Sequence, residues 1–134
     1  MTNDELIQSA EKVLNPYTTK DGRLHADVGA AVLSKNGTVY YGVCVDTTGW
    51  GLCAERSALA AMITSGEYQF EKIVAVWRDP KTNKLHALPP CGICREFARR
   101  IDESNMDALV ILGRNSTVTL RELIPHHEWP QPLS

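Results

Sequence analysis

The sequence lacks the features that mark membrane, secreted and nucleic-acid-binding proteins. No apolar run approaches the roughly 20 residues that a membrane-spanning helix needs, and the polar residues 1–5 do not have the charged-then-apolar order of a signal peptide. Lysine and arginine (14) do not outnumber aspartate and glutamate (16), so the net charge of −2 gives no general attraction to DNA or RNA. We therefore expect a cytoplasmic protein with no membrane association and no nucleic acid polymer as a partner.

The sequence also has no internal repeat, linker or low-complexity block. With 43% hydrophobic and 22% charged residues in a length of 134, it has the composition and size of one ordinary globular domain. These features predict a single domain over residues 1–134. Cysteine is scarce, with four residues, and in a reducing compartment we expect metal ligands or reactive thiols rather than a disulfide framework.

Helical and strand patterns alternate along the chain. Because such alternation is typical of a parallel or mixed sheet covered on both faces, we expect an α/β fold, a three-layer α/β/α sandwich with a mixed sheet of about five strands. If the strands that end near positions 45 and 77 run parallel, the helices after them start at the same sheet edge, where ligands bind in such folds. The predicted helices cover residues 2–14, 53–65 and 91 onward, the last with Phe97, Ala98 and Ile101 inward, and the predicted strands cover residues 28–33, 39–45, 73–77, 108–112 and 118–120.

Three of the four cysteines stand where helices are predicted to begin. Cys53 opens one helix, while Cys91 and Cys94 are three residues apart and share a face of the first turn of the next. Thiolates at helix N-termini are stabilised by free amide groups and the helix dipole, which lowers their pKa and favours metal binding. Three protein ligands leave a tetrahedral zinc ion one open position, as in catalytic rather than structural sites.

Charged residues flank these predicted ligands. Glu55 follows Cys53 by two positions and is our candidate to move protons to and from a water at the open position. Three thiolates weaken zinc as a Lewis acid, so a nearby cation is expected to withdraw charge from the sulfurs. Arg56 and Arg95 are the candidates for that role.

Two other interpretations of the cysteines remain open. A Cys-x-x-Cys pair in an α/β protein can be a redox dithiol, but this function would need neither Cys53 nor Glu55. A structural zinc site closed by Cys44 would lose the open position and leave Glu55 unexplained. Four histidines fall in predicted loop or terminal regions and are not expected to bind the metal, namely His25, His86, His126 and His127.

Residues 53–56, Cys-Ala-Glu-Arg, followed by residues 90–95, Pro-Cys-Gly-Ile-Cys-Arg, resemble the motifs of the cytidine deaminases. Weaker matches at 28–31, 42–43 and 122–125 extend the resemblance over most of the chain. It implies a cytidine deaminase-like fold and one zinc ion per subunit on Cys53, Cys91 and Cys94. It also implies that Glu55 moves protons and that Arg56 hydrogen-bonds the thiolates.

The substrate side departs from this family. Where the family usually has Asn-Val-Glu after Gly-Val, this chain has Cys-Val-Asp at 44–46, and the usual Phe before Val-Gly-Ala-Ala is Ala26. The resemblance places Cys44, Asp46 and Ala54 beside the substrate. In this family the C-terminal segment commonly reaches a neighbouring subunit of a tetramer, so Trp129 is expected either to stack on a base there or to pack on its own domain.

The resemblance implies a zinc-dependent hydrolytic deaminase that converts a cytosine-type nucleoside, cytidine or deoxycytidine, to its uracil counterpart and ammonia, a reaction of pyrimidine salvage. Residues 48–52 and 120–125 are also similar to smaller relatives that deaminate blasticidin S. Blasticidin S or another modified cytosine is therefore the alternative substrate. A structural zinc-binding module without catalysis is the alternative from a different class of function.

Overall fold

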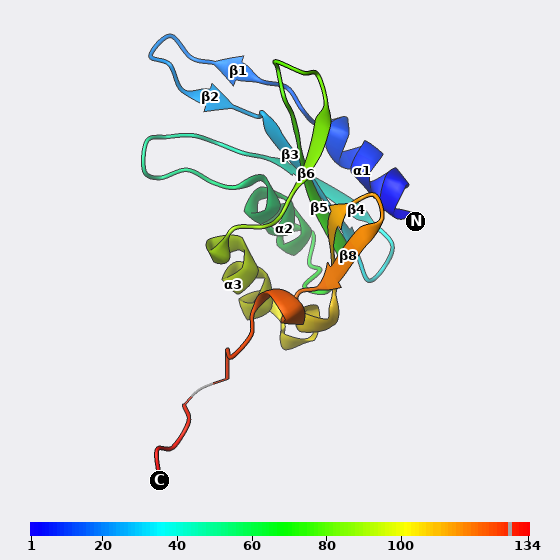
Figure 1. Cartoon of the computed structure of the whole chain (residues 1–134), viewed down its shortest axis with the longest axis vertical. Coiled ribbons are helices and arrows are strands. Elements are labelled where there is room, and N and C mark those ends of the chain that lie inside the picture. Colours follow the sequence, from blue (N-terminus) through cyan, green and yellow to red (C-terminus); the bar gives the residue numbers. More distant parts are fainter. Residues whose placement is uncertain (129) are drawn as a thin grey trace.

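The computed structural model describes residues 1–128 and 130–134, so Trp129 lies outside the described residues. A six-stranded mixed sheet forms its centre, with the strand order β4-β3-β5-β7-β8 and β6 beside β5 (Figure 1). The elements are α1 (Asn3–Glu11), β1 (Tyr17–Thr18), β2 (Leu24–His25), β3 (Val28–Ser34), β4 (Val39–Val43), α2 (Ala54–Thr64), β5 (Phe70–Arg78), β6 (Leu85–Leu88), α3 (Gly92–Ile101), η1 (Glu103–Asp107), β7 (Leu109–Gly113), β8 (Ser116–Thr119) and η2 (Arg121–Leu123).

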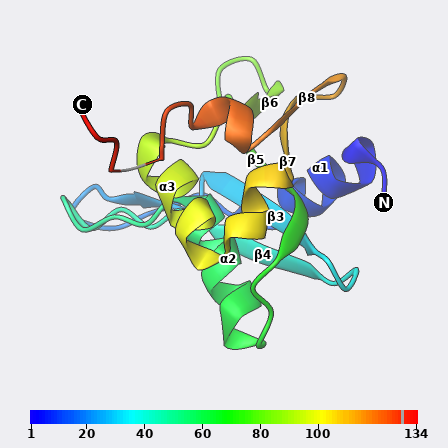
Figure 2. The ribbon, with the colours of Figure 1, turned by 90° about the horizontal axis from the view of Figure 1, so that it is seen from below.

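The central strands are buried on both faces, which explains their nearly continuous apolar sequences. Alternate residues of β3 enter two different cores, since Ala30 and Val32 face α2 and α3 while Ala31 and Leu33 face α1. Figure 2 shows the same arrangement, with α2 and α3 on one side of the sheet and α1 on the other. The predicted three-layer α/β/α sandwich with a mixed sheet is confirmed.

Helix α1 begins at its predicted cap and ends earlier than predicted. The Thr2 side chain accepts a hydrogen bond from the amide of Glu5 at 3.1 Å, which satisfies one free donor of the first turn. The helix ends at Glu11 rather than at residue 14. The amide of Leu14 instead donates three residues back to the carbonyl of Glu11 at 3.1 Å, a tight turn that closes the helix.

Two further predictions need correction. The sheet has six strands rather than about five, because residues 85–88 form β6, a strand missing from the predicted set, which pairs antiparallel with the second half of β5. Phe97 was expected to face inward, yet it is 36% exposed. The buried stripe of α3 contains Cys94 and Ala98, and Phe97 lies about 100° around the helix from Ala98.

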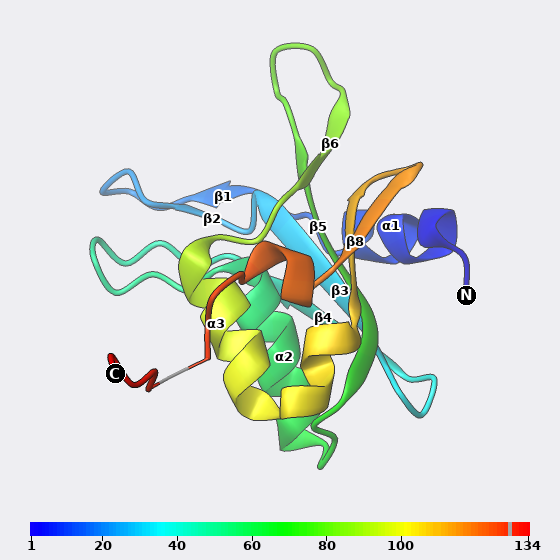
Figure 3. The same ribbon diagram turned by 60° about the horizontal axis from the view of Figure 1, so that its bottom comes forward.

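The directions of the strands bring the starts of α2 and α3 together. Strands β4 and β5 are both antiparallel to β3, so they run in the same direction on either side of it. Gly29 of β3 is level with Val43 on one side and Val76 on the other. Strand β6 then returns along β5 and ends at Leu88, opposite Ala75, so α3 starts after β6 and not directly after β5. Figure 3 shows α2 and α3 side by side.

Gly42 allows α2 to approach β4 closely. A Cβ atom at this position would lie 2.3 Å from the amide nitrogen of Ala58 and 2.6 Å from the carbonyl oxygen of Ala54. Both atoms belong to the backbone of α2 and cannot swing aside. The absence of a side chain at Gly42 therefore fixes the first turns of α2 against the end of β4.

Asn105 ties η1 to the rest of the fold from a position with no exposed surface. Its Oδ1 accepts from the amide of Phe70 at 3.1 Å, and its Nδ2 donates to the carbonyls of Tyr68 at 3.0 Å and Ala98 at 3.3 Å. One amide side chain thus satisfies backbone groups from the approach to β5 and from α3. Buried polar groups are costly when they lose such partners.

Replacing Asn105 with Ala should lower the free energy of unfolding by about 3 kcal/mol, because it leaves buried backbone groups without partners. Urea denaturation measures the change. The exposed turn residue Asn115 provides the control, since Asn115→Ala should stay within about 0.5 kcal/mol of the wild type. Equal stabilities of the two variants would contradict this role for Asn105.

Candidate active site

The thiols of Cys53, Cys91 and Cys94 gather where α2 and α3 begin. Cys53 and Cys91 are the N-cap residues of the two helices, and Cys94 lies in the first turn of α3. The Sγ atoms of Cys53 and Cys91 are 3.5 Å apart, as are those of Cys91 and Cys94, and all three lie within 4.8 Å of one another. The predicted meeting of these thiols is therefore found in the structure.

The three sulfurs fit one zinc ion. Zinc–sulfur bonds of about 2.3 Å in a tetrahedral arrangement place neighbouring sulfurs about 3.8 Å apart, close to the separations in this cluster. In the described part of the chain no other histidine, cysteine or acidic residue joins the set. The Cys44 thiol donates instead to Oδ1 of Asp27 at 3.0 Å, which gives no support to a site closed by a fourth cysteine.

The electrostatic surroundings differ between two of the thiols. Burial acts to raise the pKa of Cys91, but the amides of Cys94 and Ile93 and the neighbouring thiols outweigh it, and the pKa is lowered. Burial raises the pKa of Cys94, and the nearby charge of Glu55 adds to this rise. A divalent cation among the sulfurs offsets the repulsion between their negative charges.

Arg56 and Arg95 occupy different positions relative to the sulfurs. Nη2 of Arg56 donates to Sγ of Cys53 at 3.7 Å, and this contact raises the pKa of Arg56. Its buried Nε has no hydrogen-bond partner among the described residues. Arg95, the second predicted candidate, donates instead to the carbonyls of Pro90 at 2.8 Å and Leu123 at 3.2 Å. Arg56 is thus the cation at the thiols, while Arg95 fastens the turn before Cys91 to η2.

Glu55 lies beside the thiols as a buried carboxyl group with 6% of its surface exposed. Burial raises its pKa, and the positive charge of Arg56 acts in the opposite direction to a smaller extent. A cavity of about 10 Å³ adjoins Glu55 and is otherwise lined by apolar residues that include Ile73, Leu88 and Pro90. The backbone amide of Glu55 itself is the hydrogen-bond donor that acts on its carboxylate, and it lowers the pKa by less than burial raises it.

The substrate-side candidates have varied surroundings. Cys44 is half-buried and bonded to Asp27, a residue that the sequence prediction missed. The hairpin register sets Val28 opposite Cys44, so Asp27 could have been found as the neighbour of that pair. Asp46 is exposed, and its Oδ1 accepts from the amide of Thr48 at 3.1 Å. The side chain of Ala54 is buried, whereas Trp129 lies outside the described residues.

Two extended loops lie side by side next to this site, namely the β1–β2 hairpin and residues 44–53 (Figure 1). The amide of Asp46 donates to Nδ1 of His25 at 3.1 Å, and Nε of Arg23 donates to the Thr48 hydroxyl at 3.0 Å. Between the hairpin and β3, Ala26 has a φ of 61°, a left-handed conformation that costs an alanine about 1 kcal/mol. Two backbone hydrogen bonds hold Ala26 in this conformation. Its amide donates to the Cys44 carbonyl, and its carbonyl accepts from the Asn15 amide.

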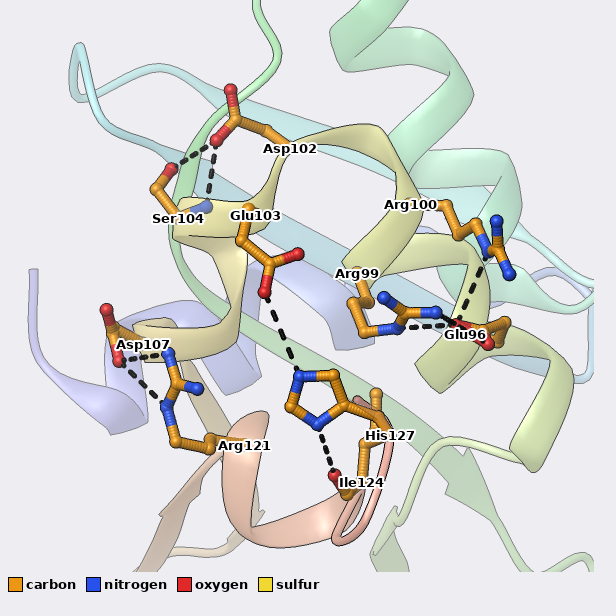
Figure 4. A network of polar contacts seen from close by, with 10 residues as sticks. All are labelled: Glu96, Arg99, Arg100, Asp102, Glu103, Ser104, Asp107, Arg121, Ile124 and His127. Carbon is orange, nitrogen blue, oxygen red and sulfur yellow. Dashed lines mark hydrogen bonds and ion pairs between the residues drawn. The ribbon is translucent and has the colours of Figure 1, made fainter. Parts of the chain in front are cut away.

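The C-terminal segment is fastened to η1 by contacts of Arg121 and His127 (Figure 4). Nη2 of Arg121 lies 3.2 Å from Oδ1 of Asp107. The ring of His127 lies between Glu103, 3.8 Å from its Nε2, and the carbonyl of Ile124, 3.2 Å from its Nδ1. This histidine therefore serves the packing of the segment, which agrees with the prediction that it does not bind the metal.

The comparisons with known proteins agree with this geometry. Residues 2–112 match the model of the cytidine and deoxycytidylate deaminase zinc-binding region. A blasticidin-S deaminase of Bacillus cereus is 32% identical over 130 residues, which cover 90% of this chain and 88% of the relative. A cytidine deaminase of Halalkalibacterium halodurans is 32% identical over 125 residues, with 90% and 86% covered.

Solved structures extend the likeness to the fold. A crystal structure of cytidine deaminase from Burkholderia pseudomallei superposes with a TM-score of 0.73 at 26% identity and covers 94% of this chain and 98% of that one. A fold of this kind with thiols at two helix starts defines a zinc-binding α/β/α domain. The match over residues 2–112 shows that the chain belongs to the cytidine and deoxycytidylate deaminase family.

Replacing Cys53, Cys91 or Cys94 with Ala should each abolish tight zinc binding, because two sulfurs cannot fill three of four tetrahedral positions. Zinc content after dialysis against a weak chelator measures this. Cys44→Ala is the matched control and should retain one zinc ion per chain. Loss of zinc in the Cys44 variant, or full retention in any of the other three, would contradict the assignment.

Proposed function

We propose that residues 1–134 form one catalytic domain, a zinc-dependent hydrolytic deaminase that converts cytidine or deoxycytidine to uridine or deoxyuridine and ammonia. The observation that carries this proposal is the pairing of a three-thiol site with a buried carboxyl group, that of Glu55, close enough for its charge to raise the pKa of Cys94. Membership of the deaminase family and the names of the relatives support the same reaction. A purely structural zinc site would need neither an open position nor Glu55.

The zinc ion is held by the thiolates of Cys53, Cys91 and Cys94. When bound, it supplies the positive charge that makes water a nucleophile near neutral pH. The guanidinium of Arg56, 3.7 Å from the Cys53 sulfur, withdraws negative charge from the thiolates.

Glu55 carries the protons of the reaction. Its carboxylate takes the two protons of the attacking water in turn, delivering the first to the ring nitrogen and the second to the departing amine, so that one water is consumed and one ammonia is released. A raised pKa suits the first step, because the ionised form of such a carboxyl group accepts a proton more readily than an ordinary exposed carboxylate does. Its apolar surroundings provide the physical cause of that property.

We assign Cys44, Asp46, Ala54 and Trp129 to the substrate side of this site. Ala54 is buried in the first turn of α2, directly after Cys53, and its assignment rests on the family resemblance. Cys44 lacks the directional amide of the family's usual Asn, and Asp46 is shorter than its usual Glu. The 32% identity to a blasticidin-S deaminase supports that modified cytosine as the second candidate substrate.

We also propose a cytoplasmic tetramer that acts in pyrimidine salvage. Zinc binding requires reduced thiols, and all four cysteines are free, which supports a reducing compartment. None of the described helices has the length and apolar character to cross a membrane. Residues 130–134 extend away from the body of the domain, which suits contact with a neighbouring subunit (Figure 1).

Glu55→Gln should retain zinc and lower kcat for cytidine by at least about a hundredfold, because the amide cannot exchange protons. Ammonia release and zinc content are measured on the same preparation. Glu71→Gln, at an exposed position of β5, is the control and should keep wild-type activity. Unchanged kcat in the Glu55 variant would remove Glu55 from the mechanism.

A further inference from the structure

The polar groups expected to recognise the sugar of the substrate are already bound to partners within the protein. The Cys44 thiol donates to Oδ1 of Asp27 at 3.0 Å. The exposed Asp46 is directed along its own loop, where it accepts the Thr48 amide at 3.1 Å. One hydrogen bond leaves most of the acceptor capacity of a carboxylate unused, and Asp27 is only half-buried. The second oxygen of Asp27 is therefore an available acceptor beside Cys44.

Backbone geometry places this acceptor next to the zinc ligands. Val45 and Leu52 form an antiparallel bridge. Cys44 precedes Val45 and Cys53 follows Leu52, so in this antiparallel arrangement the two cysteines lie opposite each other on the same face of the paired segments. Cys44 also packs against the buried core that contains the first residue of α2. The pair of Cys44 and Asp27 thus borders the metal site on the side of β4.

The charge of Asp27 has no counterion in the described part of the chain, where no Lys, Arg or His lies within ion-pair distance of it. The thiol beside it stays neutral, because burial and then the bond to Asp27 raise the pKa of Cys44. Cys44 therefore donates a hydrogen bond to one oxygen of Asp27 but does not neutralise the negative charge of the Asp27 carboxylate. A donor from a ligand can bind the other oxygen.

We propose that Asp27 determines specificity for the sugar of the substrate, with Cys44 as its positioning residue, an inference that rests on the proposed deaminase function. The free oxygen of Asp27 accepts a hydrogen bond from a sugar hydroxyl. A carboxylate binds a charged ammonium donor more strongly than a neutral hydroxyl. Cytosine nucleosides that carry an amine in place of a sugar hydroxyl are therefore bound more tightly than cytidine.

Binding to the zinc-loaded Glu55→Gln variant tests this without turnover. Calorimetry at pH 6.5 compares cytidine with 3′-amino-3′-deoxycytidine and 5′-amino-5′-deoxycytidine. At least one amine should bind about tenfold more tightly than cytidine, and adding Asp27→Asn should reduce that ratio to about one. Asp79→Asn removes a carboxylate from the turn between β5 and β6 and should leave the ratio unchanged. Asp27→Ser serves in place of Asp27→Asn if thermal unfolding shows that the latter does not fold.

The inference is overturned if neither amine binds more tightly than cytidine, if the ratio survives loss of Asp27, or if none of the three nucleosides binds. Ammonia release from cytidine by the wild-type protein is measured in parallel. If ammonia is released but Asp27→Asn leaves the ratio of amine to cytidine affinity unchanged, the role of Asp27 is contradicted and the deaminase function stands. No release from zinc-loaded protein given cytidine, deoxycytidine or blasticidin S contradicts the deaminase function itself.

Discussion

The close contact of α2 with β4 is the constraint on which the site depends. Because Gly42 has no side chain, the first turns of α2 can pack directly against the backbone of β4. A side chain at this position would collide with the backbone of α2. This contact fixes Cys53 at the start of α2, and the return of β6 along β5 brings Cys91 to the same end of the sheet. Three sulfurs then lie within 4.8 Å, at the two helix termini where amide groups favour negative charge. The metal chemistry thus follows from the packing of one helix on one strand.

The packing of α2 also buries the carboxyl group of Glu55, which costs free energy but suits proton transfer. Glu55 lies in the first turn of α2, so the helix that presents Cys53 also buries a carboxyl group against apolar residues. Burial disfavours the ionised form, and the hydrogen bond from the backbone amide of Glu55 and the charge of Arg56 offset this only in part. A water or substrate with exchangeable protons gives the carboxyl group a further partner.

The sequence was sufficient to predict the parts of the site that depend on local structure. Helix starts have strong local signals, so Cys53, Cys91 and Cys94 could be placed at N-termini and Glu55 in a first turn. The residues alone left Arg56 and Arg95 as equal candidates, and the family resemblance implied Arg56. Both follow a cysteine closely, and only the path of η2 decides which carbonyls Arg95 reaches.

Features that depend on tertiary pairing were missed or wrong. Strand β6 is four residues long and exists because the edge of β5 is free to pair with it. Phe97 belongs to a helix whose buried stripe is too narrow to include it. The bond between Cys44 and Asp27 joins residues 17 apart, across a hairpin whose register had to be known first. These cases share a cause, since each is decided by a neighbour distant in the sequence.

Ammonia release by purified wild-type protein with one bound zinc ion per chain, given cytidine, tests the central claim most directly. The account predicts release of one ammonia for each uridine formed, with no release after the zinc is removed and recovery when zinc is restored. Folded, zinc-loaded protein that releases no ammonia from cytidine, deoxycytidine or blasticidin S would contradict the account. In that case the three thiols would form a structural site.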